Sequence, residues 1–347
     1  MPEEIRAVRK LEPKPGLTLS HAPMPQPEKK DVLVKVKACS FCGTDIHIYN
    51  WDPPWSEGRL VPPRTIGHEI TGEVVQVGED VNGIEKGDFI SAESHIWCGS
   101  CDQCKRGNAH ICRNLKFIGV DIDGGMADYV VMPQQIVWKN PKDMPVELAV
   151  LQESLGNSVY TVYSGPIEGK TVVIFGNGPT ALFATGLTKV GGAAKTILVG
   201  GNEKRNVIAK KMGADIIINR REQDPLKELM DITDKQGADV VLEMAGTESS
   251  INQSLKAVRP GGRVALLGLP PEHVSIDWSK DVVLKDVDIK AIYGRKLWDT
   301  WNITSTLLHT KRLDITPIIT HTFKLDEFEK AMETAKSGSA GKVIMFP

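Results

Sequence analysis

A strand-like run that leads into a glycine turn near mid-chain constrains the fold most. Residues 171–175 are β-branched and aromatic, and Gly-Asn-Gly-Pro-Thr-Ala follows at 176–181 before an apolar, helix-length stretch to Val190. In such a turn the first glycine, Gly176, permits the tight bend, and the second, Gly178, lets a pyrophosphate approach the backbone. A proline suits the first helical turn, and a small third residue keeps helix and strand close. The segment therefore predicts a dinucleotide-binding loop.

The alternation of strands and helices continues after this loop. Strand-like runs lie at 197–199, 216–218, 240–242 and 264–268, with helix-length segments between them. Such an alternation predicts a parallel, doubly wound sheet.

The chain before this region has a different pattern. Short alternating strands at 32–37, 70–77 and 88–92 are separated by turns rich in glycine and proline, which predicts an antiparallel, barrel-like domain. A strand-like end at 341–347 could pair back into that domain. We therefore predict an α/β protein in which a catalytic domain (1–156 and 293–347) encloses a Rossmann domain (157–292).

Four of the six cysteines lie within fifteen residues, as C-x2-C-x2-C-x7-C from Cys98 to Cys112. Four thiolates at this spacing can surround a zinc ion and leave no open position, which is typical of structural zinc. Free or disulfide-paired cysteines and an iron–sulfur cluster are the alternatives. The glycine-containing segment around the cysteines favours a single zinc. The expected ligands are Cys98, Cys101, Cys104 and Cys112.

A second potential metal site involves Cys42, which begins the sequence Cys-Gly-Thr-Asp, and the pair His68-Glu69. One thiolate, one imidazole and one carboxylate with a free fourth position are typical of catalytic zinc. A buried cysteine that only packs, and a histidine that is only hydrogen-bonded, are the alternatives at these positions.

Composition excludes several classes of function. At 347 residues the chain is long enough for two domains, and its formal net charge of −2 provides no basic surface for nucleic acid. No apolar run approaches membrane-spanning length, so we expect neither a membrane anchor nor a signal peptide. Cysteines clustered as ligands suit a reducing compartment, and we expect a cytoplasmic protein.

These motifs together resemble the zinc-dependent medium-chain alcohol dehydrogenases over essentially the whole chain. Within that family the threonine dehydrogenases are the most similar. The motifs that carry this closer resemblance lie at 47–51, 95–99, 152–157, 267–271, 276–278, 293–295 and 317–321. The resemblance implies oxidation of L-threonine to 2-amino-3-oxobutanoate, two zinc ions and a homotetramer. A polyol dehydrogenase acting on sorbitol or butanediol is the alternative within the family.

The resemblance also implies roles for individual residues. Cys42, His68 and Glu69 match the catalytic zinc ligands, with Glu153 in or just outside the fourth position. Asp45 would orient His68, Thr44 and His47 match a proton relay, and His95 would face the substrate. The cofactor would contact Gly176, Gly178, Thr180, Gly200, Asn202, Lys204, Arg205, Leu267, Gly268, Leu269, Ile292 and Tyr293. Thr44 as a helix cap, His47 as an exposed residue and Glu153 as an ion-pair partner are the alternatives.

One position departs from the family. NAD-dependent Rossmann domains carry an acidic residue after the second strand, which binds the ribose 2′-hydroxyl. Here that position is Gly200, and Asn202, Lys204 and Arg205 follow. We therefore expect NADP as the preferred cofactor, with NAD as the alternative. A redox-inactive relative and a zinc-independent quinone reductase are further alternatives, and the metal-binding motifs argue against both.

Overall fold

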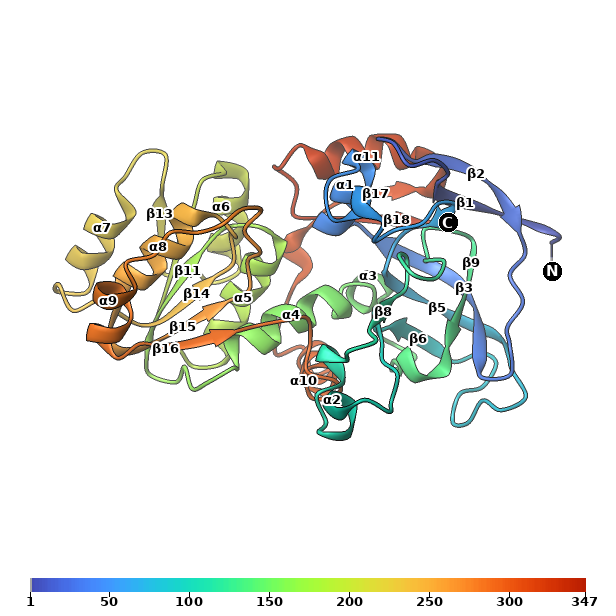
Figure 1. Cartoon of the computed structure of the whole chain (residues 1–347), viewed down its shortest axis with the longest axis horizontal. Helices are drawn as coiled ribbons and strands as arrows, with labels where there is room; N and C mark the ends of the chain where they lie inside the picture. Colours follow the sequence, from blue (N-terminus) through green and yellow to red (C-terminus); the bar gives the residue numbers. More distant parts are fainter. Residues whose placement is uncertain (1) are drawn as a thin grey trace. The chain divides into compact units, whose positions relative to one another are not determined.

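The computed structural model describes residues 2–347 and divides the chain into two compact units (Figure 1). The first unit runs to Ser154 and includes Lys296–Ser305 and Ile319–Pro347, and the second comprises Leu155–Arg295 and Thr306–Ile318. The sequence-based boundaries placed residues 306–318 in the first domain. They belong to the second unit because Leu313 packs against α5, where a β-carbon on Gly186 would lie 2.8 Å from Leu313 Cδ1.

The first unit is built mainly from antiparallel strands. Its larger sheet has the order β10-β6-β5-β3-β18-β17, with β9 also pairing with β3, and its smaller sheets are β2-β1-β4 and β7-β8. The strands are β1 (Glu4–Lys10), β2 (Thr18–Pro23), β3 (Asp31–Ser40), β4 (Arg64–Thr65), β5 (Glu69–Val77), β6 (Phe89–Ala92), β7 (His95–Ile96), β8 (Lys116–Phe117), β9 (Tyr129–Pro133), β10 (Val137–Lys139), β17 (Ile319–Lys324) and β18 (Lys342–Phe346). The helices are α1 (Gly43–Asn50), α2 (Asp102–Lys105), α3 (Val146–Ala149) and α11 (Phe328–Lys336). Two further helices, α4 (Gln152–Val162) and α10 (Asp299–His309), begin in this unit and end in the second.

The central strand β3 explains how this unit forms its core. Val34 and Val36 are buried, whereas Lys35 and Lys37 between and beyond them are exposed, as expected of a strand with one face on a core. The C-terminal strand β18 pairs antiparallel with β3, with Ile344 opposite Ser40. The expected return of the chain end to the first domain is therefore confirmed.

The second unit is a six-stranded sheet of order β13-β12-β11-β14-β15-β16, and all five neighbouring pairs are parallel. The strands are β11 (Thr171–Phe175), β12 (Lys195–Gly200), β13 (Ile216–Asn219), β14 (Ala238–Glu243), β15 (Val258–Leu266) and β16 (Asp288–Ala291). The helices are α5 (Pro179–Val190), α6 (Glu203–Lys211), α7 (Pro225–Ile232), α8 (Glu248–Ala257) and α9 (Trp278–Asp281). Strand β11 is almost wholly buried, as expected of a central strand covered on both faces. The predicted doubly wound parallel sheet is confirmed.

No helix among residues 2–347 is both long and apolar enough to cross a membrane.

Candidate metal centres and cofactor loop

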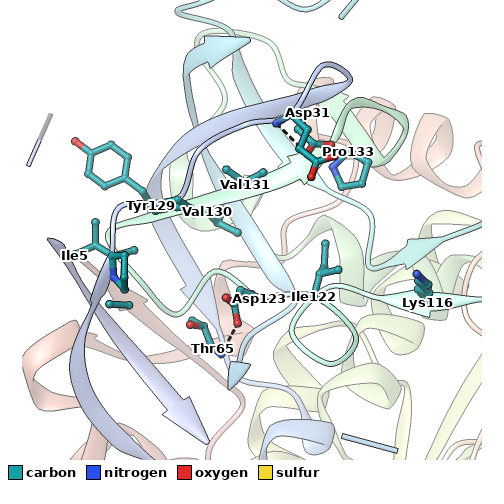
Figure 2. A pocket seen from close by; sticks show the side chains of 15 residues that line it. Ile5, Asp31, Thr65, Lys116, Ile122, Asp123, Tyr129, Val130, Val131 and Pro133 are labelled. Atoms are coloured by element: carbon teal, nitrogen blue, oxygen red, sulfur yellow. Dashed lines mark hydrogen bonds between the residues drawn. The ribbon is translucent and has the colours of Figure 1, made fainter. Parts of the chain in front are cut away.

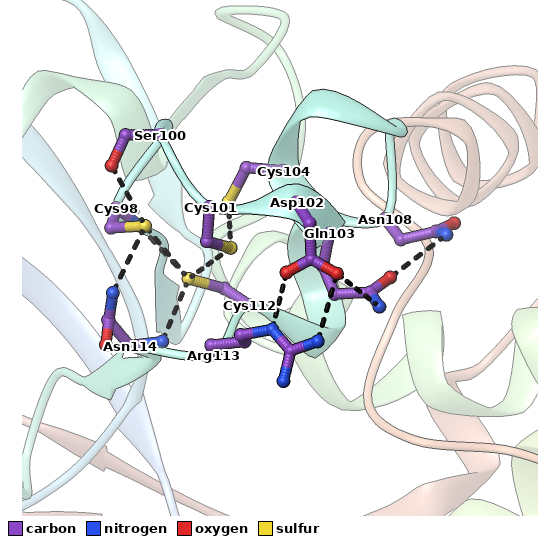
Figure 3. Close-up of polar contacts among 10 residues, drawn as sticks. All are labelled: Cys98, Ser100, Cys101, Asp102, Gln103, Cys104, Asn108, Cys112, Arg113 and Asn114. Carbon is purple, nitrogen blue, oxygen red and sulfur yellow. Dashed lines mark hydrogen bonds and ion pairs between the residues drawn. The ribbon is translucent and has the colours of Figure 1, made fainter.

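Figure 3 shows the four-cysteine lobe, in which Cys98, Cys101, Cys104 and Cys112 converge. The Sγ atoms of Cys98 and Cys112 lie 3.5 Å apart, those of Cys101 and Cys104 3.5 Å, and those of Cys101 and Cys112 3.8 Å. These are not disulfide distances, and all four cysteines are free thiols. A tetrahedron with metal–sulfur bonds of about 2.3 Å has edges of about 3.8 Å. The lobe therefore fits a zinc ion bound by four sulfurs.

Backbone amides of the lobe support negative charge on three of these sulfurs, those of Cys98, Cys101 and Cys112. The amides of Cys98 and Asn114 each donate to Cys112 Sγ at 3.3 Å. The amide and hydroxyl of Ser100 lower the pKa of Cys98 to about 5, with further help from the Cys101 amide. The fold itself thus favours the thiolate, the form that binds metal, at Cys98 and Cys101. Burial and the neighbouring Cys101 and Cys112 instead raise the pKa of Cys104 to about 12.

The second group brings together Cys42, His68 and Glu69, whose ligand atoms all lie within 4.8 Å of one another. Cys42 is the N-cap of α1, and Glu69 begins β5. Gly67 precedes the pair at φ +93°, where a β-carbon would meet Cys39 Sγ and Met126 within 3 Å. Only glycine fits this close approach, which brings His68 toward the start of α1. The donor set of sulfur, nitrogen and oxygen suits zinc with a position left open.

Glu69 has a partner that the sequence analysis missed. Lys342 of β18 donates from Nζ to Glu69 Oε1 at 2.7 Å and to the Phe41 carbonyl at 2.8 Å. Ser40 and Ser154 also donate to Glu69, and Glu69 and Lys342 are 0% and 2% exposed. Burial lowers the pKa of Lys342, but the negative charges of Glu69, Cys42 and Glu153 together outweigh burial and raise it. A charged ammonium thus stabilises the carboxylate beside the cysteine and histidine.

The acidic residues around this group differ in position. Asp45 is fully buried, accepts from the Cys42 amide at 2.8 Å, and lies with Oδ1 3.9 Å from His68 Nδ1. Among residues 2–347, the group of ligand atoms within 4.8 Å does not include Glu153. Glu153 is nevertheless buried. The pKa of Asp45 is raised mainly by the burial of Asp45, and the negative charge of Glu153 adds to this rise. The concentration of negative charge here favours a cation.

Helix α1 also carries the two predicted relay residues, which are three positions apart and so share a face. Thr44 Oγ1 lies 3.9 Å from Cys42 Sγ. The ring of His47 is 61% exposed, and its Nδ1 lies 2.9 Å from Asp52 Oδ2. Because the N-cap of α1 is Cys42, the alternative role of Thr44 as a helix cap is not needed.

His95 belongs to a buried hydrogen-bonded chain. Its Nδ1 lies 2.7 Å from Glu93 Oε1, and the other carboxylate oxygen accepts from Trp301 Nε1 at 2.6 Å. Glu93 is wholly buried. The hydrogen bond between Glu93 and His95 Nδ1 fixes the orientation of the imidazole ring, so Nε2 is the ring nitrogen that faces away from Glu93. The sequence analysis missed Glu93, although an acid two residues before a histidine was a usable signal.

The glycine loop has the expected backbone conformation. Gly176 adopts φ +112° with the backbone of Met244 close by, and Gly178 is the N-cap of α5. Thr180 lies in the first turn of that helix. Loop residue Asn177 donates from Nδ2 to the Asn202 carbonyl and to Asn206 Oδ1, both at 2.9 Å. The loop is thus tied to the segment after β12.

Family models match two parts of the chain: the alcohol dehydrogenase GroES-like domain matches residues 28–142, and the zinc-binding dehydrogenase model matches residues 179–310. The chain belongs to the zinc-binding dehydrogenases. It is 49% identical over 345 residues to L-threonine 3-dehydrogenase of Pyrococcus furiosus, covering 99% of each chain. It is 45% identical to L-threonine 3-dehydrogenase of Bacillus licheniformis over the full length of both. Among solved structures, one described as a zinc-binding dehydrogenase from Sinorhizobium meliloti 1021 bound to NADP has a TM-score of 0.91 at 29% identity, with full coverage of both chains.

In this zinc-binding dehydrogenase, asparagine side chains fill the space beside Gly200 at the end of β12. A β-carbon on Gly200 would lie 2.2 Å from Asn206 Oδ1 and 2.6 Å from Asn177 Nδ2. Asn202 caps α6 by accepting from the Arg205 amide at 3.1 Å, so its side-chain oxygen already has a partner. Lys204 is exposed and Arg205 is partly buried in the first turn of α6.

The later predicted cofactor residues lie at the ends of β15 and β16. Leu267 donates its amide to the Glu243 carbonyl at 2.9 Å, and Gly268 approaches Gly246 so closely that a β-carbon would lie 2.2 Å from its nitrogen. Leu269 and Tyr293 are 81% and 45% exposed, whereas Ile292 is buried. Ligands of parallel sheets bind at such strand ends.

A cavity of about 540 Å³ opens in the first unit beside β1 and β9 (Figure 2). Ile5, Tyr129 and Val131 line it, and the Thr65 amide donates to Asp123 at its edge, at 2.8 Å. None of the predicted metal, relay or cofactor residues lines this cavity. The chemistry-bearing residues of the dehydrogenase therefore lie elsewhere.

Proposed function

We propose that this protein is an L-threonine 3-dehydrogenase with one catalytic and one structural zinc, which oxidises the secondary alcohol of L-threonine to 2-amino-3-oxobutanoate. The observation that carries the proposal is the 49% identity to a threonine dehydrogenase over 99% of both chains. The converged group of Cys42, His68 and Glu69 supports it, because this chemistry needs a metal with an open position. The first unit has the catalytic role and the second binds the cofactor.

Bound zinc supplies a Lewis acid that lowers the pKa of an alcohol, and a nicotinamide cofactor supplies the acceptor for the hydride. The chain's own residues hold these groups and move the proton. Cys42, His68 and Glu69 would hold the metal, with Glu153 as the candidate for the fourth position or a place just outside it. Asp45 would orient the imidazole of His68, because its buried Oδ1 lies 3.9 Å from His68 Nδ1 and has no other hydrogen-bond partner within residues 2–347.

Thr44 receives the proton of the substrate hydroxyl, and His47 delivers it to solvent. Thr44 is suited to this role because its hydroxyl lies beside Cys42 Sγ, and His47 because its ring is exposed and oriented by Asp52. His95, held through Nδ1 by Glu93, presents its other nitrogen to the substrate. His47→Ala should lower turnover on the order of 100-fold at neutral pH, with the loss shrinking at high pH, where water or buffer can take the proton.

The preferred cofactor in this proposal is NADP. No carboxylate follows β12 at the position that would bind a free 2′-hydroxyl, since that position is Gly200. The nearest acid, Glu203, is directed toward β13, with Oε2 3.5 Å from Asn219 Nδ2. The cations of Lys204 and Arg205 lie in the same turn of the chain. NAD is the alternative.

We further propose that the protein is a cytoplasmic homotetramer. Strand β16 is an edge strand of the parallel sheet, and exposed apolar side chains lie in the segment before it: Trp278, Val283 and Leu284 are 58%, 61% and 81% exposed. An edge strand close in sequence to exposed apolar side chains favours pairing between copies. All six cysteines are free thiols, which suits the reducing cytoplasm.

The test is kcat/KM for L-threonine, sorbitol, butane-2,3-diol and simple alcohols, each with NADP and NAD. We expect the highest value for L-threonine with NADP, and a preference over NAD of tenfold or more. A higher value for a polyol would overturn the threonine assignment, and a higher value with NAD would overturn the cofactor assignment.

A further inference from the structure

The turn after β13 carries an arginine that the sequence analysis did not single out. Strands β12 and β13 are parallel neighbours, with Gly200 opposite Asn219, so Gly201 and Arg220 leave the sheet side by side. The Arg220 amide donates to the Gly200 carbonyl at 3.1 Å, which fixes this turn against the end of β12.

The side chain of Arg220 extends over Gly201. A β-carbon on Gly201 would lie 2.6 Å from Arg220 Nε, 3.0 Å from Cζ and 3.1 Å from Nη2. The guanidinium therefore occupies the space that any side chain at position 201 would need. Gly201 is buried, whereas Arg220 is exposed.

The guanidinium has no acidic partner among residues 2–347. None of the ion pairs and side-chain hydrogen bonds of residues 2–347 involves the Arg220 guanidinium. Glu222 is the acid nearest in sequence, and it forms no ion pair with Arg220. Asp224 caps α7 by accepting from the Leu226 amide at 3.0 Å, and Glu203 faces Asn219. The planar donors of Arg220 are thus available for an anion in solvent.

The location of this anion site follows from the fold. In a Rossmann domain the adenosine ribose is bound at the end of the second strand, here β12, and a nearby arginine can accommodate a 2′-phosphate. The guanidinium suits phosphate because its donors form parallel charge-assisted hydrogen bonds. Asn177 and Asn206 fill the space beside Gly200, so a phosphate would lie toward Gly201 and Arg220 rather than deeper in the fold.

We propose that Arg220 is the specificity-determining residue for the adenosine 2′-phosphate, and that glycine is required at position 201 to let its guanidinium cover the end of β12. This inference rests on the proposed preference for NADP and names the residue that produces it.

The experiment compares the zinc-loaded, full-length protein with its Arg220→Ser and Arg221→Ser variants. Arg221 is the matched control, because it is an exposed arginine in the same turn and its removal changes the net charge equally. Isothermal titration calorimetry measures the Kd of 2′,5′-ADP and of 5′-AMP, which differ only in the 2′-phosphate. Neither probe contains nicotinamide, so the readout is independent of turnover.

We expect Arg220→Ser to weaken binding of 2′,5′-ADP tenfold or more and to change binding of 5′-AMP less than about twofold. Arg221→Ser should change both less than about threefold, and Arg220→Lys should keep part of the affinity for 2′,5′-ADP. Equal weakening of both probes by Arg220→Ser, or an equal effect of Arg221→Ser, would overturn the assignment of Arg220.

The wild-type titration separates this inference from the proposed cofactor. If the wild type binds 2′,5′-ADP no more tightly than 5′-AMP, the preference for NADP itself is wrong. If the wild type prefers 2′,5′-ADP and Arg220→Ser keeps that preference, only the role of Arg220 is wrong.

Discussion

The two cysteine-containing groups of the first unit use different geometry. The lobe from Cys98 to Cys112 offers four identical soft ligands, close in sequence, at the edge lengths of a small tetrahedron. The group of Cys42, His68 and Glu69 offers three different ligands from two separate segments. The first arrangement closes around a metal, and the second leaves a position for a substrate.

The residues that support the two groups also differ, because one group is supported locally and the other by residues distant in the sequence. The cysteine lobe is supported by amides of its own short loop, such as those of Cys98 and Asn114. The other group depends on distant residues, because Glu69 is paired with Lys342 from the C-terminal strand. Metal binding at the four-cysteine lobe can therefore be lost without loss of the Cys42/His68/Glu69 site. The latter, called the mixed site because its three ligands differ, is sensitive to changes far away in the sequence.

The largest expected effect is that of Cys42→Ser on turnover. Removing the thiolate should remove the metal and lower kcat for threonine oxidation on the order of 10³-fold, since a Lewis acid contributes several kcal/mol. Steady-state kinetics measures the loss. Cys39→Ala is the matched control, because Cys39 is buried nearby but belongs to neither group, and it should keep most of the turnover. Equal losses in the two variants would contradict a metal role for Cys42.

Lys342→Met should have the next largest effect, on stability. Removing one partner of a buried ion pair costs about 3–5 kcal/mol, because the other charge is left uncompensated. We expect the loss to be larger in the metal-free protein than in the zinc-loaded one, since zinc also neutralises Glu69. Denaturant unfolding of both forms measures it. Lys37→Met, which breaks the exposed Lys37–Glu73 pair at 3.0 Å on neighbouring strands, should cost less than about 1 kcal/mol. A loss of that small size for Lys342→Met would disprove the stabilising role of the pair.

Cys101→Ser should act mainly on the lobe. It should release one zinc and lower the free energy of unfolding by about 2 kcal/mol, or roughly 4–8 °C in the unfolding temperature. The zinc at Cys42 should remain. Metal analysis and thermal unfolding test this together, and a variant with both zincs and unchanged stability would show that the lobe binds no metal.

Asp45→Asn should have the smallest effect, confined to the mixed site. It preserves shape but removes the charge beside His68, and partners of metal ligands typically contribute about 10-fold or more in affinity. Competition with a zinc indicator measures that affinity. The control is Asp102→Asn, which breaks the exposed pair with Arg113 in the four-cysteine lobe. It should leave the zinc affinity of the Cys42 site unchanged. Unaltered zinc affinity in Asp45→Asn would remove Asp45 from the site.

The two groups also differ in how far the sequence predicts them. The ligands of the lobe and the turn from β11 to α5 could be predicted because each depends on residues a few positions apart. The pairs Lys342–Glu69 and Trp301–Glu93 could not, since their members are 273 and 208 residues apart and only the sheet and helix packing join them. The contact of Arg220 with Gly201 likewise depends on the pairing of β12 with β13.

Gly200 shows a further limit of the sequence. The missing acid indicated the cofactor preference, but not that Asn177 and Asn206 occupy the space a side chain would need. We therefore expect Gly200→Glu to disturb the glycine loop rather than simply to exchange one cofactor for another. The presence of strands was easier to predict, because a run of β-branched and aromatic residues such as 171–175 indicates a strand by its composition alone.

The most direct test of the difference between the two groups is a timed dialysis of the wild-type protein against a chelator, in which zinc per chain and threonine oxidation are measured on the same samples. We predict two zincs per chain at the start, loss of activity in proportion to the first equivalent released, and retention of the second equivalent in folded protein. Activity that persists after one equivalent has left, or two equivalents that leave in parallel, would contradict the assignment of one open catalytic site and one closed structural site.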